Sequence, residues 1–409
     1  MALSGPRPLF LDAGDSSALI TGGVVAAFGP HARASDDARV IDCRGMSVRP
    51  GAVNAHTHLY SGLAPLGMPA PEPPPESFVQ ILERVWWRLD RALDAASLRA
   101  AAELYIAEAL LAGTTTLIDH HESPSFISGS LELLADAAQT LGCRLATGYG
   151  ATDRNRGPDE GRRGLDECQR FARENTRPLV RPLAALHASF TVSDDTVIQA
   201  GKLGLPMHVH VAEDAADVAD AKQRGYAGPL QRLMALGALP PGSILAHGVH
   251  LSEDEVRSAD GAGLWLVQNP RSNAGNRVGF ARTLDASCRV ALGTDGYPAD
   301  MRAERAALLT EARGAGHVMD DALGAARARG AYPLASSLFG LRLESEVGAG
   351  CAADLVVWRS VGDNSPLYVV VGGELVVESG RLCCGEIQLI RSRAAEQAPL
   401  LWQRMKALP

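Results

Sequence analysis

The sequence predicts an α/β protein: a distorted (β/α)8 TIM barrel with a small β-sandwich domain formed by the N- and C-terminal segments. Three observations predict this fold. The chain has 409 residues, enough for one large barrel and a small second domain. Its middle alternates short apolar runs with helix-like stretches, in about eight units between residues 50 and 345, as expected for parallel strands joined by crossover helices. Its two ends are instead rich in β-like runs.

The terminal segments carry the signals of short hairpins. The first fifty residues contain runs such as SALITGG and VVAAFG, and a late segment reads VVVGGELVV, two β runs around a Gly-Gly turn. We therefore expect a composite sandwich from 1–50 and 346–395, a barrel over 51–345, and a C-terminal helix or tail over 396–409. The proline-rich stretch Ala64–Phe78 is too long for an ordinary turn and predicts a lid or entrance loop.

Composition and simple motifs exclude several other classes. An open doubly wound sheet is the alternative fold, but no G-x-G-x-x-G turn follows the early strands. The net charge of -8 argues against a nucleic-acid or anionic-membrane surface. The sequence shows no signal peptide and no run of 18 apolar residues, which would indicate a membrane span. Seven scattered cysteines without C-x-x-C favour a reducing compartment, so we expect a cytoplasmic protein.

The first polar cluster is the pair His56 and His58 in VNAHTHLYSG, where the first barrel strand ends. Residues two apart in a strand face the same side, so both imidazoles would point into the barrel mouth. Two neutral imidazoles on one face can bind one metal ion. For an isolated H-x-H, two polar residues at the start of a loop is the simpler interpretation.

The second cluster is MHVHVAED, which holds His208, His210 and Glu213. His210 shares its face with His208, and Glu213 falls on the turn just past the strand. A carboxylate there can shuttle protons at a metal-bound water. The alternative is an acid that stabilises the next helix through its dipole.

Three further strand ends carry His187, His247 and Asp295. An aspartate at the end of a buried strand needs a partner, because burying a bare carboxylate is costly. Each of the five signals is weak alone. Together they place histidine or aspartate at five strand ends, while the helices between stay nearly free of histidine.

This set resembles the mononuclear aminohydrolase branch of the amidohydrolase superfamily, which includes guanine, cytosine and methylthioadenosine deaminases and the triazine hydrolases. The resemblance spans nearly the whole chain and rests on VRPGAVNAHTHL, LLAGTTTLID, LHASFTVS, HVAED, LAHGVHL, NPRSNAGNRVG and LGTDG. WWRLD, IDHHESP and NPRSNAGNRVG look most like the SsnA-like aminohydrolases, which are associated by name with selenium metabolism.

The resemblance implies a role for each matched residue. The metal ligands would be His56, His58, His210 and Asp295. Glu213 would shuttle protons, His247 would polarise the attacking water, and Asp295 would accept that water's proton. Substrate would contact His187, with His121 and Asn273 as further candidates. Binuclear relatives carry a carbamylated lysine on the fourth strand; here that strand has none, so we expect one divalent ion per chain, Zn²⁺ in preference to Fe²⁺.

The implied activity is metal-dependent hydrolytic deamination of a nitrogen heterocycle of purine, pterin, pyrimidine or triazine type, with attack by metal-bound hydroxide and release of ammonia. The alternatives are hydrolysis of another C–N, C–Cl or C–S bond, or a non-catalytic assembly subunit. We expect a small-molecule substrate, no nucleic-acid or membrane partner, and a homodimer or larger homo-oligomer.

Several residues keep two interpretations. His208 is expected to be packed core in preference to a ligand, and Trp86–Trp87 to pack a helix on the barrel in preference to stacking on a ring. Either His120 or His121 is a candidate for the pocket wall. The arginines of DRNRGPDEGRR (153–163) are expected in a solvated loop, with an acidic substrate group as the alternative partner.

Overall fold

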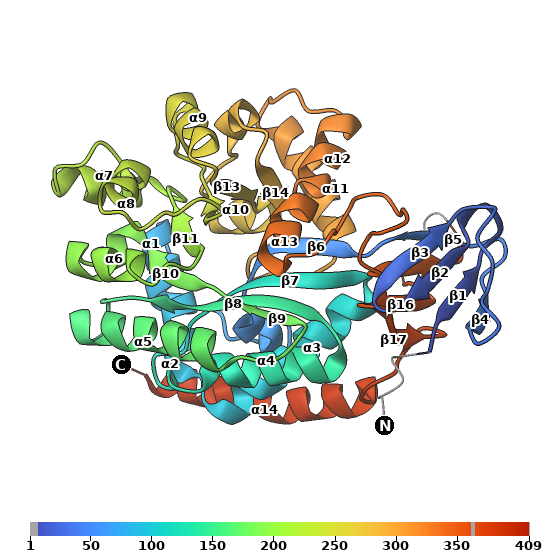
Figure 1. Cartoon of the computed structure of the whole chain (residues 1–409). Helices are drawn as coiled ribbons and strands as arrows, with labels where there is room; N and C mark the ends of the chain where they lie inside the picture. Colours follow the sequence, from blue (N-terminus) through green and yellow to red (C-terminus); the bar gives the residue numbers. More distant parts are fainter. Residues whose placement is uncertain (1–6, 361–364, 409) are drawn as a thin grey trace.

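The computed structural model describes residues 7–360 and 365–408, which form a barrel beside two small sheets (Figure 1). Eight parallel strands make up the barrel in the order β6, β7, β8, β10, β11, β12, β13 and β14, and β9 (Val180–Pro182) pairs with β8. Their bounds are Ala52–Thr57 (β6), Thr114–His121 (β7), Arg144–Ala151 (β8), Ala184–Ala188 (β10), Met207–Val211 (β11), Ile244–His247 (β12), Trp265–Gln268 (β13) and Val290–Leu292 (β14).

The barrel is nearly closed between its first and last strands. The backbone N–H groups of Thr294 and Asp295, just past β14, both donate to the carbonyl of His56 in β6, at 2.9 Å. These bonds join the two strands that carry three of the expected metal ligands. The predicted (β/α)8 barrel is confirmed.

The barrel strands are buried on both faces. Every residue of β7, TTTLIDHH, is buried, because helices cover the outer face of the strand and its inner face packs in the barrel interior. The outer helices are α3 (Ala95–Leu111), α4 (Ser130–Leu141), α5 (Pro158–Glu174), α6 (Asp194–Gly201), α7 (Ala215–Gln223), α8 (Pro229–Ala235), α9 (Glu253–Gly261), α10 (Pro270–Asn276), α11 (Met301–Gly314), α12 (Asp321–Arg329) and α13 (Ala331–Phe339). Short 3-10 turns η4 (Ser189–Thr191) and η5 (Arg282–Ala286) follow β10 and α10.

The segment between β6 and α3 brings apolar side chains to the barrel mouth. It contains η2 (Leu59–Leu63), the proline-rich stretch, α1 (Phe78–Ile81), the π-helical turn η3 (Leu82–Trp86) and α2 (Trp87–Ala92). Ser77 starts α1 by accepting a hydrogen bond from the backbone of Gln80. The predicted entrance loop therefore leads directly into helices that line the pocket described below.

The two ends of the chain form two small sheets that pack together. One has the order β3, β2, β1, β4 and the other the order β18, β17, β16, β15, β5. The bounds are Leu9–Asp12 (β1), Ala18–Thr21 (β2), Val24–Phe28 (β3), Arg39–Asp42 (β4), Ser47–Pro50 (β5), Leu355–Trp358 (β15), Tyr368–Val371 (β16), Glu374–Glu378 (β17) and Arg381–Leu382 (β18), with the 3-10 turn η1 (Gly14–Ser16) after β1. Their shared core includes Leu11, Ile20, Leu355 and Val370. The predicted Gly-Gly hairpin joins β16 to β17, and both glycines have positive φ.

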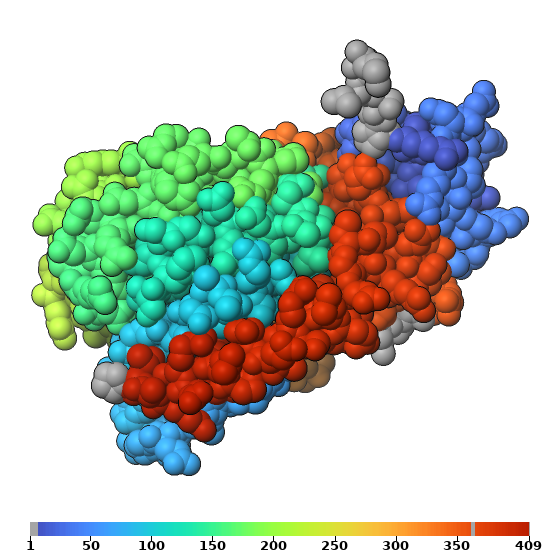
Figure 2. Space-filling model, turned by 90° about the horizontal axis from the view of Figure 1, so that it is seen from below, coloured from blue at the N-terminus to red at the C-terminus, as the bar shows by residue number. Residues whose placement is uncertain are grey.

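The last helix, α14 (Ile387–Ala407), begins before residue 396 and lies against the barrel's outer helices. Figure 2 shows it as a red band across the blue and cyan surface formed by the segment that precedes β7. Leu401 and Trp402 join the same core cluster as Leu98 of α3, and Arg404 donates to the carbonyl of Ala92 at 2.8 Å. Within residues 7–360 and 365–408, no helix combines the length and apolarity needed to cross a membrane.

Candidate metal centre and active site

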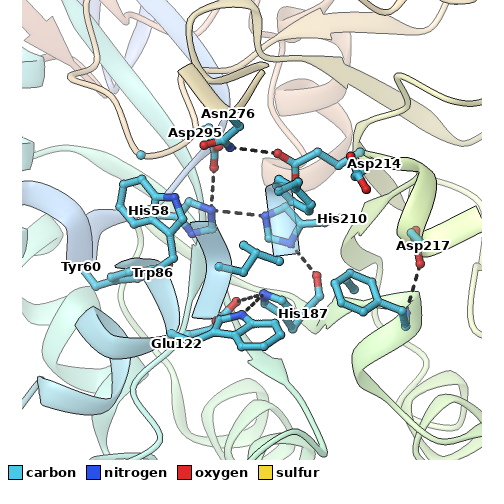
Figure 3. A pocket seen from close by; sticks show the side chains of 17 residues that line it. His58, Tyr60, Trp86, Glu122, His187, His210, Asp214, Asp217, Asn276 and Asp295 are labelled. Atoms are coloured by element: carbon cyan, nitrogen blue, oxygen red, sulfur yellow. Dashed lines mark hydrogen bonds and ion pairs between the residues drawn. The ribbon is translucent and has the colours of Figure 1, made fainter. Parts of the chain in front are cut away.

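Four side chains from three strand ends, His56, His58, His210 and Asp295, meet at the mouth of the barrel. Figure 3 shows three of them, His58, His210 and Asp295. Nε2 of His58 lies 2.7 Å from Oδ1 of Asp295 and 3.3 Å from Nε2 of His210. Nε2 of His56 lies 3.2 Å from the same oxygen of Asp295. Tetrahedral ligands that are each about 2.0–2.1 Å from a zinc ion stand about 3.3 Å apart, so these separations suit one ion.

The hydrogen bonds behind the imidazoles decide which nitrogen faces the centre. Nδ1 of His58 donates to the carbonyl of His120 at 2.6 Å, and Nδ1 of His210 donates to the carbonyl of His187 at 2.5 Å. A carbonyl only accepts, so both Nε2 atoms carry lone pairs in the neutral rings. When both rings are neutral, the two lone pairs face each other at 3.3 Å, an arrangement that a cation stabilises; in the absence of a metal ion, a proton on Nε2 of His58, held by Asp295, takes that place. The donor set therefore fits the expected divalent metal.

His208 lies one layer below this centre, as expected from its place on β11. Its Nε2 is 2.9 Å from Nδ1 of His56, and the side chain is fully buried. This contact leaves Nε2 of His56 for the centre. His208 thus orients one of the candidate ligands from behind.

Burial and the Asp295 carboxylate set the protonation of the cluster. Burial places the pKa of His56 and of His210 well below the usual value, so both rings are neutral. Burial opposes ionisation of Asp295, but hydrogen bonds from His56 and His58 hold its pKa well below the ordinary value. Burial also opposes a charged His58, yet the Asp295 carboxylate raises its pKa to about 9. A binding cation must therefore displace a proton from His58.

Beside this centre, Glu213, His247 and Asp295 form a second cluster. Nε2 of His247 lies 3.6 Å from Oε2 of Glu213 and 4.0 Å from Oδ2 of Asp295. Burial raises the pKa of Glu213 to about 7, a suitable value for a group that both takes and returns protons near neutrality. Asp214, not Glu213, caps α7 by accepting from Ala216 at 2.9 Å, so the helix-cap interpretation does not apply to Glu213.

The backbone is bent sharply at the strand ends that carry these groups. His247 and Asp295 have φ values of 75° and 53°, and Ala212, next to Glu213, has 50°. Non-glycine residues rarely adopt this left-handed conformation, and it concentrates at functional sites. The bends turn all three strand ends toward one point.

Helix α10, from the NPRSNAGNRVG segment, supports this second cluster with three side chains. Ser272 Oγ donates to Oδ2 of Asp295, Oδ1 of Asn273 lies 2.8 Å from Nδ1 of His247, and Asn276 donates to Oε1 of Glu213 at 3.1 Å. Sequence reasoning considered only Asn273 and missed Ser272 and Asn276. Their i, i+4 spacing on one helix face is the signal that was available.

The pocket over the centre has an apolar wall and a polar floor (Figure 3). His187 lines it, as expected. Trp86 and Trp87 pack their helix on the barrel, as expected, and they also line the cavity. The residues that line the pocket are His58, Tyr60, Phe78, Leu82, Trp86, Trp87, Glu122, His187, Ala188, Phe190, His210, Glu213, Asp214, Asp217, Asn276, Asp295 and Gly296.

Two of the three expected substrate contacts are placed elsewhere. Asn273 reaches the site only through His247. His121 is fully buried behind the wall, where Nε2 meets Ser123 Oγ at 2.8 Å and the ring packs on Tyr149. Successive residues of a strand alternate in direction, so β7 turns His121 away from the barrel, and Glu122 just past its end faces the pocket instead.

The expectation of a solvated arginine loop is wrong for Arg154. Its guanidinium is buried between the carboxylates of Asp90 and Glu122, and it lies 5.1 Å from the ring centroid of Trp87. These partners come from segments distant in the sequence, so the loop's polar composition gave no sign of them.

Comparison with known proteins agrees with this architecture. A 5-methylthioadenosine/S-adenosylhomocysteine deaminase of Archaeoglobus fulgidus is 30% identical over 396 residues, covering 88% of each chain. Among solved structures, a zinc-bound adenosine deaminase of Xanthomonas campestris has a TM-score of 0.82 at 23% identity, covering 98% of this chain and 99% of its own. A zinc complex of atrazine chlorohydrolase from Arthrobacter aurescens has a TM-score of 0.78 at 21% identity, covering 96% of this chain and all of its own.

A family model matches residues 47–376, which is most of the barrel together with the strands on either side of it. This match and the relative at 30% identity over most of both chains confirm the predicted family, and with it a hydrolase with a divalent-metal site that acts on carbon–nitrogen bonds. The chain belongs to the Amidohydrolase family.

Proposed function

We propose that this protein is a hydrolytic deaminase of an amino-substituted nitrogen heterocycle, with purines of the adenine-nucleoside type as the first candidates. The observation that carries the proposal is the convergence of Glu213, His247 and Asp295 on one point beside the candidate metal ligands. The name of the Archaeoglobus relative, an adenosine-type deaminase, supports the choice of purines.

The metal would be held by His56, His58, His210 and Asp295, and when bound it supplies a Lewis acid that activates water near neutral pH. We propose Zn²⁺, which suits three imidazoles and one carboxylate. The zinc named for two structural neighbours agrees with this choice.

Side chains of the protein then carry out the proton transfers. Oδ2 of Asp295 accepts a proton from the attacking water, and the Ser272 hydroxyl fixes that oxygen in place. Glu213, within reach of the same point, carries the proton to the ring nitrogen next to the carbon under attack, so that negative charge does not build up on the ring. Nε2 of His247 faces the oxygen that becomes the new carbonyl. As the attacking oxygen becomes the carbonyl, Glu213 takes its remaining proton and passes it to the amino group, which leaves as ammonia.

The pocket wall suits a flat, partly apolar ring. Phe78 and Leu82 belong to one buried cluster, the partly buried Phe190, Trp86 and Trp87 pack against it, and these five side chains line the cavity above the polar floor. Aromatic walls bind rings and exclude water, which strengthens the interactions of the charged groups below.

Cytoplasmic residence and a homo-oligomeric state also remain proposals. The first is supported by seven free cysteines, four of them buried, as expected in a reducing compartment.

Ammonia release tests the proposal directly. The zinc-loaded protein is incubated with adenosine, 5'-methylthioadenosine, guanine, pterin, cytosine and melamine, and ammonia is measured. We expect turnover of at least one purine. The Glu213→Gln variant, loaded equally, serves as the control for contaminating deaminases. A chlorotriazine is incubated in parallel, and release of its chloride without ammonia from any amino ring would contradict deamination and favour the alternative hydrolysis.

A further inference from the structure

The pocket is lined by many acidic side chains and by none of the strongly basic ones. Five of its residues carry carboxylates: Glu122, Glu213, Asp214, Asp217 and Asp295. Among the described residues, no lysine or arginine contributes to the lining. The pocket is the proposed substrate site because of the groups at its floor, so the charge of its lining bears on which substrates it admits. A cleft lined by one sign of charge concentrates the opposite charge and repels its own.

Four of the five carboxylates are engaged by other groups of the protein. Arg154 binds Glu122 at 3.1 Å, and Asp295 belongs to the candidate metal centre. Asp217 accepts one backbone N–H with each of its two oxygens. Glu213 accepts from a side-chain amide of α10 and faces the polar floor. These four side chains therefore have structural or proposed catalytic partners.

Asp214 differs because one of its oxygens is free. Oδ1 accepts from the backbone N–H of Ala216 at 2.9 Å and so caps α7. Oδ2 makes no hydrogen bond to any described residue, and it is not among the atoms that are fully covered. The side chain is half-buried and lines the cavity (Figure 3). A helix N-terminus ordinarily favours an anion, and here the protein's own carboxylate takes that place.

The two arginines near the pocket do not offset this charge. The side chain of Arg154 is only 5% exposed and is bound between the carboxylates of Asp90 and Glu122. Arg277 follows a residue of the lining, but it is exposed, donates to the carbonyl of Pro75 at 2.9 Å and does not itself line the cavity. An anionic group inside the pocket would therefore meet carboxylates without a free guanidinium or ammonium group to bind it.

We propose that the pocket admits uncharged or cationic heterocycles and rejects those with a phosphate or carboxylate substituent, with Asp214 as a specificity-determining residue. This inference rests on the proposed function and names its substrate class: free bases and nucleosides, as opposed to nucleotides and carboxylated rings. The empty space of the cavity is about 610 Å³. Its width is therefore comparable with the screening length of about 8 Å in physiological salt, so the charge of Asp214 acts on a substituent elsewhere in the cavity.

The competing interpretation is that Asp214 serves only as a helix cap. Asp214→Asn separates the two roles, because asparagine caps helices about as well as aspartate but carries no charge. Asp220→Asn is the matched control. Asp220 lies on the same helix outside the pocket, where it pairs with Arg224 at 2.7 Å, and its substitution makes the same change in net charge. An exposed ion pair of this kind contributes little to stability.

The experiment compares three adenine nucleosides that differ only at the 5' position. 5'-Amino-5'-deoxyadenosine is a cation near neutral pH, adenosine is uncharged, and adenosine 5'-carboxylate is an anion. Binding is measured calorimetrically with zinc-loaded protein in a Glu213→Gln background, which suppresses turnover. Acetate is titrated separately, because a bare carboxylate bound directly to zinc would not depend on Asp214.

We expect affinity to decrease from the amine to the alcohol to the carboxylate. The amine should bind about 100-fold more tightly than the carboxylate, since one unit charge near another in a poorly solvated cleft changes binding about 10-fold, with opposite sign for the two compounds. Asp214→Asn should reduce this ratio about 10-fold, whereas Asp220→Asn should leave it unchanged. High salt should also reduce the ratio, because the interaction is electrostatic.

Equal affinity for the three nucleosides, or tighter binding of the carboxylate, would overturn the proposal. Loss of such carboxylate binding in Arg277→Gln would then assign anion recognition to that arginine. An unchanged ratio in Asp214→Asn, or an equal decrease in Asp220→Asn, would overturn the role of Asp214. The ranking before substitution decides charge selection even if Asp214→Asn does not fold.

Failure of this inference is distinguishable from failure of the proposed function. Ammonia release from a purine, together with equal binding of the three nucleosides, would contradict charge selection alone. The expected ranking without ammonia release from any ring would support charge selection and contradict deamination alone. Binding of none of the three would overturn the purine assignment and this inference together.

Discussion

Nδ1 of His247 lies 2.8 Å from Oδ1 of Asn273, and this contact fixes which face of the imidazole meets the substrate. Because the amide oxygen accepts, the proton of the neutral ring is on Nδ1 and the lone pair is on Nε2. Nε2 has no hydrogen-bond partner among the described residues and points between Glu213 and Asp295. Asn273 is therefore a positioning residue for His247.

Replacing Asn273 with leucine should lower kcat about 10- to 100-fold while zinc content stays at the wild-type level, because His247 is not a candidate ligand. Asn273→Asp keeps an acceptor in place and should restore most of the rate. Steady-state kinetics and elemental analysis of the two variants check this. Equal kcat in Asn273→Leu and wild type would show that the ring needs no such support.

Metal content is the simplest prediction. One set of three imidazoles and one carboxylate should hold one divalent ion per chain, and no lysine stands on the fourth strand to bridge a second. Elemental analysis after zinc loading and removal of loose metal should give a ratio near one. Reproducible tight binding of two ions contradicts the mononuclear centre.

The two histidines of β11 should behave differently. His210→Ala removes a candidate ligand and should abolish tight zinc binding, as should His56→Ala. His208→Ala removes only the support behind His56, so zinc should remain bound with affinity reduced about 10- to 100-fold, together with a loss of stability from the buried cavity. Zinc titration against a competing chelator measures all three. An empty centre in His208→Ala beside a filled one in His210→Ala would reverse the assignment.

Glu213→Gln should keep zinc and substrate binding and lose turnover. The amide has nearly the same shape but carries no proton, and general acid–base catalysis contributes about 10²–10⁴-fold in rate, or about 3–5 kcal/mol. Because one residue serves both proton transfers, the loss should reach the upper part of that range. Zinc content, melting temperature and kcat are compared with wild type. A near-normal kcat at full zinc removes Glu213 from the mechanism.

Asp217 should make stability depend on pH. It is buried beside the pocket, where it accepts from the backbone of Ala212 at 2.8 Å and of Phe190 at 3.1 Å, yet burial raises its pKa to about 7. Because the folded state binds the carboxyl proton more tightly, the stabilisation is complete below the unfolded pKa of 3.8. It decreases as the pH rises from there and is lost as the pH passes through the folded pKa of about 7. The complete loss is about 4 kcal/mol, at 1.36 kcal/mol for each pKa unit.

The side chain in Asp217→Asn does not titrate. As the pH rises from 5 to 8, wild type should therefore lose stability relative to the variant. The lost acceptor adds a constant penalty that does not change with pH. Denaturant unfolding of both zinc-loaded proteins at several pH values gives the difference. A difference that stays flat over this range would show that Asp217 ionises normally.

The sequence by itself determined the barrel and which side chains gather at its mouth. Strand–helix alternation is a local pattern, and parallel strands of a barrel all present their carboxyl ends on one face, so His56, His210 and Asp295 meet whatever the details of packing. The two-residue spacing likewise placed His58 beside His56 and His208 below His210. The fold, the family and the divalent metal are confirmed, whereas the roles of individual residues remain predictions.

Only the tertiary structure decided which residues support the site residues and which residues line the pocket. Asp90, Glu122 and Arg154 meet from three segments that lie far apart in sequence, and each alone reads as a surface charge. Trp87 reaches the pocket because α2 follows the entrance loop over the barrel mouth, which no periodicity encodes. The direction of His121 depended on where β7 ends, since a shift of one residue reverses the facing of a strand. Partners and facing are set by packing between distant elements, so they appear only when the chain is folded.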